Sequence, residues 1–436
     1  MKLKSISITN YRCFRHYHLN IAPQTTIIIG RNGAGKTTIL NALKKALTVI
    51  FAPKNGNPII SEDSKLKIQN FDTADFYYKN GSYSKDLCLS ANAVIIDKTI
   101  NWELYQESVS SRLEAKKYFD ALSEFALEYK KTKAFTIIAA YSDTFSYNDK
   151  KLSEYENTSV NKDILPKVLG YNKVFDTNGS VNVWQKRFVK AIFNRKVSNL
   201  WNREYLFVLK KMQFFSAILN DDGKDYTISD MYIDDLSNSL SLMFKFANNE
   251  KISFENLPSG YKRLYSIALD IAYRQYALNG STDKCDGIVF IDEIDSHLHP
   301  QIVGNVVDAF QKTFPNIQFV ISTHSPLVLI NFNTGKIING ETVNRSYKID
   351  RSKLNAVPVT DVFGLDYNTG LRDGLNAFPR KISLSESIDK LVAFKYNNDK
   401  ENYDREYNKV ADFMGDAVVN VAKEVDLILE HYAENR

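Results

Sequence analysis

The chain has 436 residues, 44% of them hydrophobic and 25% charged, with a formal net charge of +5. This balance is ordinary for a soluble globular protein of two or three domains, or of one elaborated domain. The three cysteines lack metal-ligand spacing, no apolar run reaches the length of a membrane span, and the N-terminus lacks a signal peptide's apolar core. We therefore expect a cytoplasmic protein with no membrane partner. Contact with DNA is possible, but dedicated binders carry denser basic stripes.

The first fifty residues predict two strands and a strand-to-helix turn. Residues 2–9 alternate in polarity as a strand with one solvated face does, and residues 16–21 predict a second strand. The apolar run 27–29 then enters the segment GRNGAGKTT, which begins at Gly30, and a helical pattern of leucines follows.

This glycine-rich segment fits the phosphate-loop pattern G-x-x-x-x-G-K-[ST] at every fixed position. Glycines let backbone N–H groups converge on phosphates, and the following helix adds the partial positive charge of its N-terminus. Lys36 can reach the β- and γ-phosphates, and Thr37 can hold Mg²⁺. A turn that binds nothing is the alternative, but the strand before and the helix after favour a nucleoside triphosphate. The expected ATP-binding residues here are Gly30, Arg31, Asn32, Gly33, Ala34, Gly35, Lys36, Thr37 and Thr38.

The middle of the chain is less regular. Short apolar runs in residues 65–100 predict a small antiparallel sheet, a helical period covers 103–130, and the apolar run 135–141 predicts a buried strand. Within 142–256, an amphipathic helical pattern occupies 183–211. The sequence shows no internal repeat and no heptad pattern long enough for an extended coiled coil.

A strong helical pattern over residues 261–276 follows the segment LPSG. Ser259 and Gly260 stand where this helix starts, and free backbone N–H groups with a small hydroxyl make such a start an anion site. Because the phosphate loop is already one such site, we expect Ser259 and Gly260 to bind the γ-phosphate of ATP held by another subunit. A serine-glycine helix cap without a ligand is the alternative.

The predicted strand 287–291 ends in two acids, Asp292 and Glu293. A buried strand has no reason to end in paired carboxylates unless a cation lies beyond it. In nucleotide hydrolases the first acid orients Mg²⁺ or its water, and the second polarises the attacking water. We expect Asp292 and Glu293 to fill these two roles.

The next predicted strand, 318–322, leads to His324, which can contact the γ-phosphate at the neighbouring strand end. A histidine that merely satisfies hydrogen bonds is the alternative. His297 and His299 with Asp295 resemble a metal cluster by composition. Their context favours a connecting loop at a dimer interface instead.

The ordered motifs NYRCF, GRNGAGKTT, LPSGYKR, IVFIDEIDSHLHP and ISTHSP resemble the ATPase heads of the ABC superfamily, on its RecF/SMC/OLD side. In that family's terms they include Walker A, a signature motif, Walker B, a D-loop and an H-loop. The signature departs from the usual LSGGQ, because Pro258 replaces a serine and Tyr261-Lys262 replace Gly-Gln. No glutamine is assigned to a Q-loop; Gln69 and Gln213 are weak candidates.

The resemblance implies an α/β fold, an ABC-type ATPase head with a mixed central sheet, an inserted mainly helical lobe and a helical C-terminal tail. The expected parts are the first half of the head at 1–50, an insertion at 51–255 that returns to the head near 135–141, the second half of the head at 256–345, and a helical region for partner or subunit contacts at 346–436.

The resemblance also implies ATP hydrolysis with ATP and Mg²⁺ as cofactors. It assigns catalysis to Glu293 and His324, and the metal to Thr37 and Asp292. Two chains would form a head-to-tail homodimer, the unit of any larger homo-oligomer, with ATP between Lys36 of one subunit and Ser259-Gly260 of the other.

Without a long coiled coil or a membrane partner, the chain resembles the stand-alone ATPases of bacterial antiphage systems such as Septu, retrons and PARIS. This implies a sensor or regulatory subunit that controls a separate effector nuclease or toxin in trans, since no nuclease motif follows His324. Two alternatives stay open. One is a RecF-like repair ATPase acting on DNA ends, although basic residues such as Arg195-Lys196 and Lys210-Lys211 are scattered. The other is a nucleotide-gated scaffold with little turnover.

Overall fold

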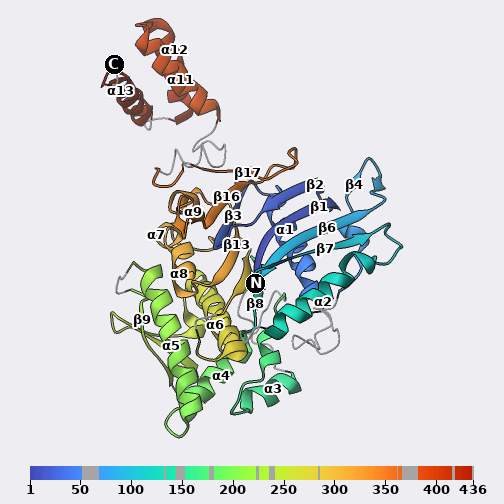
Figure 1. Cartoon of the computed structure of the whole chain (residues 1–436). Coiled ribbons are helices and arrows are strands. Elements are labelled where there is room, and N and C mark those ends of the chain that lie inside the picture. Colours follow the sequence, from blue (N-terminus) through green and yellow to red (C-terminus); the bar gives the residue numbers. More distant parts are fainter. Residues whose placement is uncertain are drawn as a thin grey trace. The chain divides into compact units, whose positions relative to one another are not determined.

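The fold is taken from a computed structural model (Figure 1). It describes residues 1–51, 68–131, 134–143, 153–175, 181–221, 225–234, 241–282, 285–360, 362–365, 382–414 and 418–434. The chain divides into two compact units, Met1–Leu365 and Asp366–Arg436.

A six-stranded mixed sheet forms the centre of the first unit, in the order β17-β16-β3-β13-β12-β8. Neighbours from β16 to β8 run parallel, and β17 pairs antiparallel with β16 at one edge. Strands β3, β13, β12 and β8 are buried along their whole length, as parallel strands covered on both faces are. The bounds are β3 Thr25–Ile29, β8 Ile137–Tyr141, β12 Gly287–Ile291, β13 Ile317–Thr323, β16 Asn344–Lys348 and β17 Val357–Pro358.

A four-stranded antiparallel sheet, ordered β2-β1-β6-β7, comes from the N-terminal part of the chain. Helix α1 (Lys36–Leu47) lies between this sheet and the central one (Figure 1), in contact with β1, β6 and β13. Its buried Ile39, Leu43 and Leu47 recur at helical spacing. The bounds are β1 Lys2–Tyr11, β2 Phe14–Asn20, β6 Leu87–Ile95 and β7 Lys98–Gln106.

The prediction of a helix over residues 103–130 is wrong at the N-terminal end of that range. Residues 103–106 belong to β7, in which buried Trp102, Leu104 and Gln106 alternate with more exposed neighbours. This two-residue period suits a strand with one buried face. Helix α2 (Lys116–Lys131) begins ten residues after the end of β7 and packs against that strand.

Helices and a small sheet form a lobe of the first unit between β8 and β12 (Figure 1). Helix α6 (Ser259–Asn279) packs against α4, α5 and β8. Its wholly buried Asp270 accepts hydrogen bonds from Trp184 Nε1 at 2.5 Å, Tyr141 Oη at 2.6 Å and Arg274 Nε at 2.6 Å. The other bounds are α3 Glu154–Asn161, α4 Val181–Asn194, α5 Asn199–Leu219, β9 Ile228–Asp234, β10 Ser241–Phe246 and β11 Lys251–Ser253.

Three helices form the described part of the second unit, α11 (Ile382–Tyr396), α12 (Lys400–Met414) and α13 (Val418–Glu434). They bury a common apolar core that includes Leu391 and Val425. The predicted fold class is therefore confirmed, an α/β head with a mixed central sheet, an inserted mainly helical lobe and a helical C-terminal region. The first unit also contains three short helices, α7 Pro300–Val303, α8 Val306–Thr313 and α9 Pro326–Ile330. It contains two hairpins as well, β4 Tyr78–Lys79 with β5 Ser82–Tyr83 and β14 Ile337–Ile338 with β15 Glu341–Thr342. Among the described helices, none is both long and apolar enough to cross a membrane.

Candidate nucleotide-binding site

The central sheet collects three of the predicted site segments at one edge. Strand β3 leads into the phosphate loop, β12 ends just before Asp292, and β13 ends just before His324. These strands are parallel neighbours, with β13 in the middle. The carboxyl ends of parallel strands share one edge of a sheet, which is where α/β proteins bind ligands.

The phosphate loop is held in shape by its own lysine. The Lys36 side chain is 5% exposed, and its Nζ donates to the backbone oxygens of Gly30 at 2.9 Å and Arg31 at 3.4 Å. Gly35 precedes α1 with φ of 107°, and a Cβ there would lie 2.5 Å from Cζ of Phe14. Both the conformation and the space therefore require glycine at position 35.

A cavity of about 280 Å³ lies at this loop. Among the described residues that line it, Glu293 is the one acid, and it follows directly after the end of β12. The other lining residues are Cys13, Asn32, Gly33, Ala34, Gly35, Lys36, Thr37 and Thr38. The structure thus brings Glu293, the second of the two paired acids, to the phosphate loop.

An adjacent cavity of about 210 Å³ holds both predicted metal ligands. Thr37 lines this cavity as well as the first one, and Asp292 lines it from the end of β12. Ser142 and Asp143, which follow β8, form another part of its wall. A hydroxyl and carboxylates are oxygen ligands of the kind Mg²⁺ prefers.

Ser322 positions both acids and was not predicted. Its hydroxyl donates to Asp292 Oδ1 and accepts the backbone N–H of Glu293 at 2.9 Å. Glu293 has φ of 46°, a left-handed conformation that costs a non-glycine residue about 1–3 kcal/mol and is common at functional sites. A polar residue inside the buried strand FVIST was the sequence signal for Ser322.

Arg263 joins the signature helix to the same strand end. It is 5% exposed, and its Nη2 donates to the backbone oxygens of Asp292 at 2.7 Å and Ser142 at 3.2 Å. Burial lowers the pKa of Arg263, an effect partly opposed by Asp295 and other nearby acids. The sequence placed Arg263 in the signature motif but did not predict that it would hold the Walker B backbone.

His324 lies beside Asp295 rather than in the phosphate-loop cavity. Its Nε2 is 3.6 Å from Asp295 Oδ2, its side chain is 51% exposed, and it does not belong to the residues that line that cavity in the described structure. Asp295 also accepts a hydrogen bond from Thr323 Oγ1 at 2.5 Å. His299 Nδ1 accepts the Gln301 N–H as the cap of α7. Within the described ranges, no group of three or more His, Cys, Asp or Glu side chains could hold a metal.

Ser259 and Gly260 form the first turn of α6, and Ser259 is exposed. This helix start has no side-chain cap and no acid in its first turn. A Cβ on Gly260 would lie 2.5 Å from the backbone oxygen of His297, so the helix start packs directly on the segment at His297 and Leu298. Neither residue lines the cavity at Lys36 of the same chain, as far as the described residues show.

Neither weak Q-loop candidate lines the phosphate-loop cavity. Gln213 Nε2 donates to the backbone oxygen of Ser229 at 2.7 Å, and Gln69 lines a different cavity beside α1.

Comparison with known proteins gives a family and several relatives. Residues 25–331 match the family described as AAA domain, putative AbiEii toxin, Type IV TA system. The chain is 29% identical to the Retron Vc95 probable ATPase of Vibrio cholerae serotype O1 biovar El Tor, with 78% of this chain and 74% of that protein covered. It is 25% identical to the Retron Ec83 probable ATPase of Escherichia coli, with 75% and 69% covered.

A more distant relative is the Septu protein PtuA of Bacillus mycoides, 23% identical over 77% of this chain and 40% of that protein. Among solved structures, the SMC head domain from Thermotoga maritima aligns with a TM-score of 0.42 and 14% identity over 83% of this chain and all of that one. The retron and Septu matches confirm the resemblance that the motifs predicted.

Proposed function

The chain belongs to the family described as AAA domain, putative AbiEii toxin, Type IV TA system, and on that premise we propose that it hydrolyses ATP with Mg²⁺ as a regulatory subunit of an antiphage system. The observation that carries the hydrolysis proposal is the phosphate-loop cavity. A carboxylate, Glu293, lines the same cavity as Lys36 and Thr37. This is the arrangement that a nucleotide hydrolase needs around a γ-phosphate.

The residues at the loop fit ATP and Mg²⁺. Converging backbone N–H groups and the start of α1 suit the phosphates, and Lys36 Nζ, now bonded to two loop oxygens, can turn to them. Thr37 and Asp292 would hold the cation, which would neutralise charge on the phosphates. Ser322 fixes the Asp292 carboxylate, and the backbone of Glu293 aims its side chain at the loop. Glu293 would accept the proton of the attacking water.

We further propose that two chains share their nucleotides head to tail. The uncapped start of α6, with Ser259 exposed, supports this because its N–H groups and hydroxyl suit a phosphate that its own chain does not place there. His324 would then reach the γ-phosphate only in the assembled site. In this proposal, the head comprises 1–50 and 256–345, the insertion comprises 51–255, and the region 346–436 contacts partners or other subunits.

The biological role is proposed from the relatives. Proteins named as retron ATPases and as Septu protein PtuA match most of this chain. We propose that ATP binding and hydrolysis let this chain hold or release a separate effector, a nuclease or a toxin, in the cytoplasm.

Phosphate release from Mg-ATP by the purified chain tests the hydrolysis proposal. Glu293→Gln should lower the rate by about a thousandfold, as expected when a general base is lost, and should leave ATP bound. Glu124→Gln is the matched control, because Glu124 lies on α2 in an exposed ion pair with Lys98. Removal of Mg²⁺ with EDTA should stop hydrolysis. Release by Glu293→Gln at the wild-type rate would refute the assigned role.

The effector role needs a test in cells. A bacterial host should lose fewer cells to phage when it carries this chain together with the product of the neighbouring gene. Lys36→Ala should cancel that protection. Protection by this chain alone would contradict a separate effector.

A further inference from the structure

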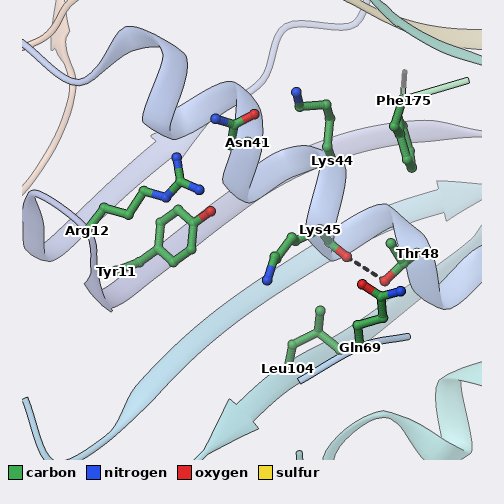
Figure 2. A pocket seen from close by; sticks show the side chains of 9 residues that line it. All are labelled: Tyr11, Arg12, Asn41, Lys44, Lys45, Thr48, Gln69, Leu104 and Phe175. Carbon is green, nitrogen blue, oxygen red and sulfur yellow. Dashed lines mark hydrogen bonds between the residues drawn. The ribbon is translucent and has the colours of Figure 1, made fainter. Parts of the chain in front are cut away.

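Helix α1 lies between two sheets, yet one side of it is polar. Thr37, Asn41 and Lys44 recur at helical spacing, and all three line the cavity of about 210 Å³ at the ends of β8 and β12. Asn41 and Lys44 are half-buried, and polar side chains that leave water need polar partners. Figure 2 shows the side chains of Lys44 and Lys45 leaving the helix in different directions. Lys45 pairs with Asp75, whereas Lys44 lines this cavity.

Two acids line the same cavity, as far as the described residues show. Asp292 follows β12 directly, and Asp143 is the second residue after β8. Burial lowers the pKa of Lys44 and Asp292 opposes the shift, so the ammonium lies near the Asp292 carboxylate. One ammonium cannot neutralise two carboxylates. The described wall of the cavity therefore suits a further cation.

The backbone that leads to Asp143 is fixed beside Asp292. The Asp292 N–H donates to the backbone oxygen of Tyr141 at 2.8 Å, so the ladder between β8 and β12 continues one residue beyond the strands. Arg263 Nη2 then donates to the backbone oxygens of Asp292 at 2.7 Å and Ser142 at 3.2 Å. The two segments that carry the acids are thus tied together at the sheet edge.

We propose that Asp143 is a further ligand of the Mg²⁺, in addition to Thr37 and Asp292. Carboxylate and hydroxyl oxygens are the ligands that this hard cation prefers, and it keeps several waters when bound. The amide oxygen of Asn41, on the same side of α1, can accept a hydrogen bond from such a water. This assignment rests on the proposed Mg-ATP site and extends its ligand set.

The position of Asp143 separates its role from that of Glu293. Glu293 lines the phosphate-loop cavity, and Asp143 does not belong to the described residues that line it. Asp143 lines the adjoining cavity, which it shares with Thr37 and Asp292. Its carboxylate therefore acts on the cation and not on the attacking water.

Binding of a fluorescent, non-hydrolysable ATP analogue to the full chain, measured in Mg²⁺ and again in EDTA, tests the assignment. The ratio of the two dissociation constants measures the contribution of the cation. Asp143→Asn should reduce this ratio about tenfold, as expected when a group that holds a metal is lost. Affinity in EDTA should not fall, because a carboxylate repels metal-free phosphates.

Two variants serve as controls. Asp143→Glu keeps the carboxylate and should restore most of the contribution of Mg²⁺. Asp308→Asn removes an exposed carboxylate on α8 and should bind the analogue like the wild type. Asp143 is exposed, so its substitution should cost little stability, and thermal unfolding of each variant verifies that it is folded.

Two results would overturn the assignment while leaving the proposed function intact. One is a wild-type ratio in Asp143→Asn. The other is an equal loss of affinity with and without Mg²⁺, which would mean that Asp143 supports the fold or the phosphates and not the metal. A wild-type chain that binds the analogue equally well in Mg²⁺ and in EDTA would instead refute the proposed metal site, and the Asp143 assignment with it.

Discussion

The starts of α1 and α6 are the two helix N-termini that we propose bind phosphate, but their surroundings differ. At α1, Lys36 is 5% exposed, and Glu293 of the same chain lines the cavity. At α6, Ser259 is exposed and lies outside that cavity. The start of α1 lines a cavity together with an acid of its own chain, whereas the start of α6 presents an exposed serine that would meet a phosphate of another chain in the proposed dimer. We infer that nucleotide binding belongs to one chain and hydrolysis to two.

The anchoring of the two helices also differs. Helix α1 is placed by its loop and by the two sheets on either side of it. Helix α6 is fixed by buried polar groups, Arg263 on the Walker B backbone and Asp270 on α4 and β8. Buried polar networks whose members are all hydrogen-bonded rigidify the elements that they join.

Lys36→Ala should have the largest effect, and it tests the cavity at the start of α1, which residues of one chain line. It removes the ammonium that we propose reaches the β- and γ-phosphates, so affinity for Mg-ATP should fall about a hundredfold or more. Fluorescence titration with a labelled ATP analogue measures this change. Lys98→Ala, an exposed lysine on β7, should bind like the wild type. Unchanged affinity in Lys36→Ala would mean that the loop does not hold the nucleotide.

Asp270→Asn tests the anchoring of α6. The substitution removes the charge that Arg274 faces and turns one acceptor oxygen into a donor beside Trp184 or Tyr141. Breaking one partner of a buried pair is strongly destabilising, and we expect a loss of about 3 kcal/mol in the free energy of unfolding of the first unit. Urea unfolding followed by tryptophan fluorescence measures it.

A control for Asp270→Asn is Asp308→Asn, whose exposed ion pair with Lys312 on α8 should matter little. If Asp270→Asn were as stable as the wild type, the network would not be what holds α6.

Ser259→Ala should have the smallest effect, and it tests the start of α6, which in our proposal binds the nucleotide of a second chain. Loss of one hydroxyl to a charged phosphate should lower ATP turnover about tenfold and leave ATP affinity nearly unchanged. Turnover per chain measured at increasing protein concentration checks the shared site, because wild-type turnover should rise as dimers form. Turnover independent of concentration, and equal in Ser259→Ala, would contradict sharing.

Much of the site followed from local sequence. The phosphate loop can be recognised in the sequence because its chemistry fixes glycine, lysine and threonine at set spacings. The two acids after IVFI mark the end of a buried strand. In the structure, Lys36, Thr37, Asp292 and Glu293 line two adjoining cavities, and their binding of ATP and Mg²⁺ remains a prediction. The roles of Glu293 and His324 remain predictions.

Other features depend on long-range contacts and could not be read locally. The helical period over 103–130 failed at 103–106 because β7 alternates against β6, a partner that no window of sequence reveals. The contacts that Ser322 and Arg263 make with Asp292 join separate strands and helices.

The sequence alone determined the family resemblance and the prediction of phosphate-binding chemistry, since both reside in short motifs whose residue types and spacing are fixed by local chemistry. The tertiary structure decided which side chains position Asp292 and Glu293 and how α6 is anchored. The reason is physical: a parallel sheet brings together strand ends from distant parts of the chain, and only the folded register sets which polar atoms meet there.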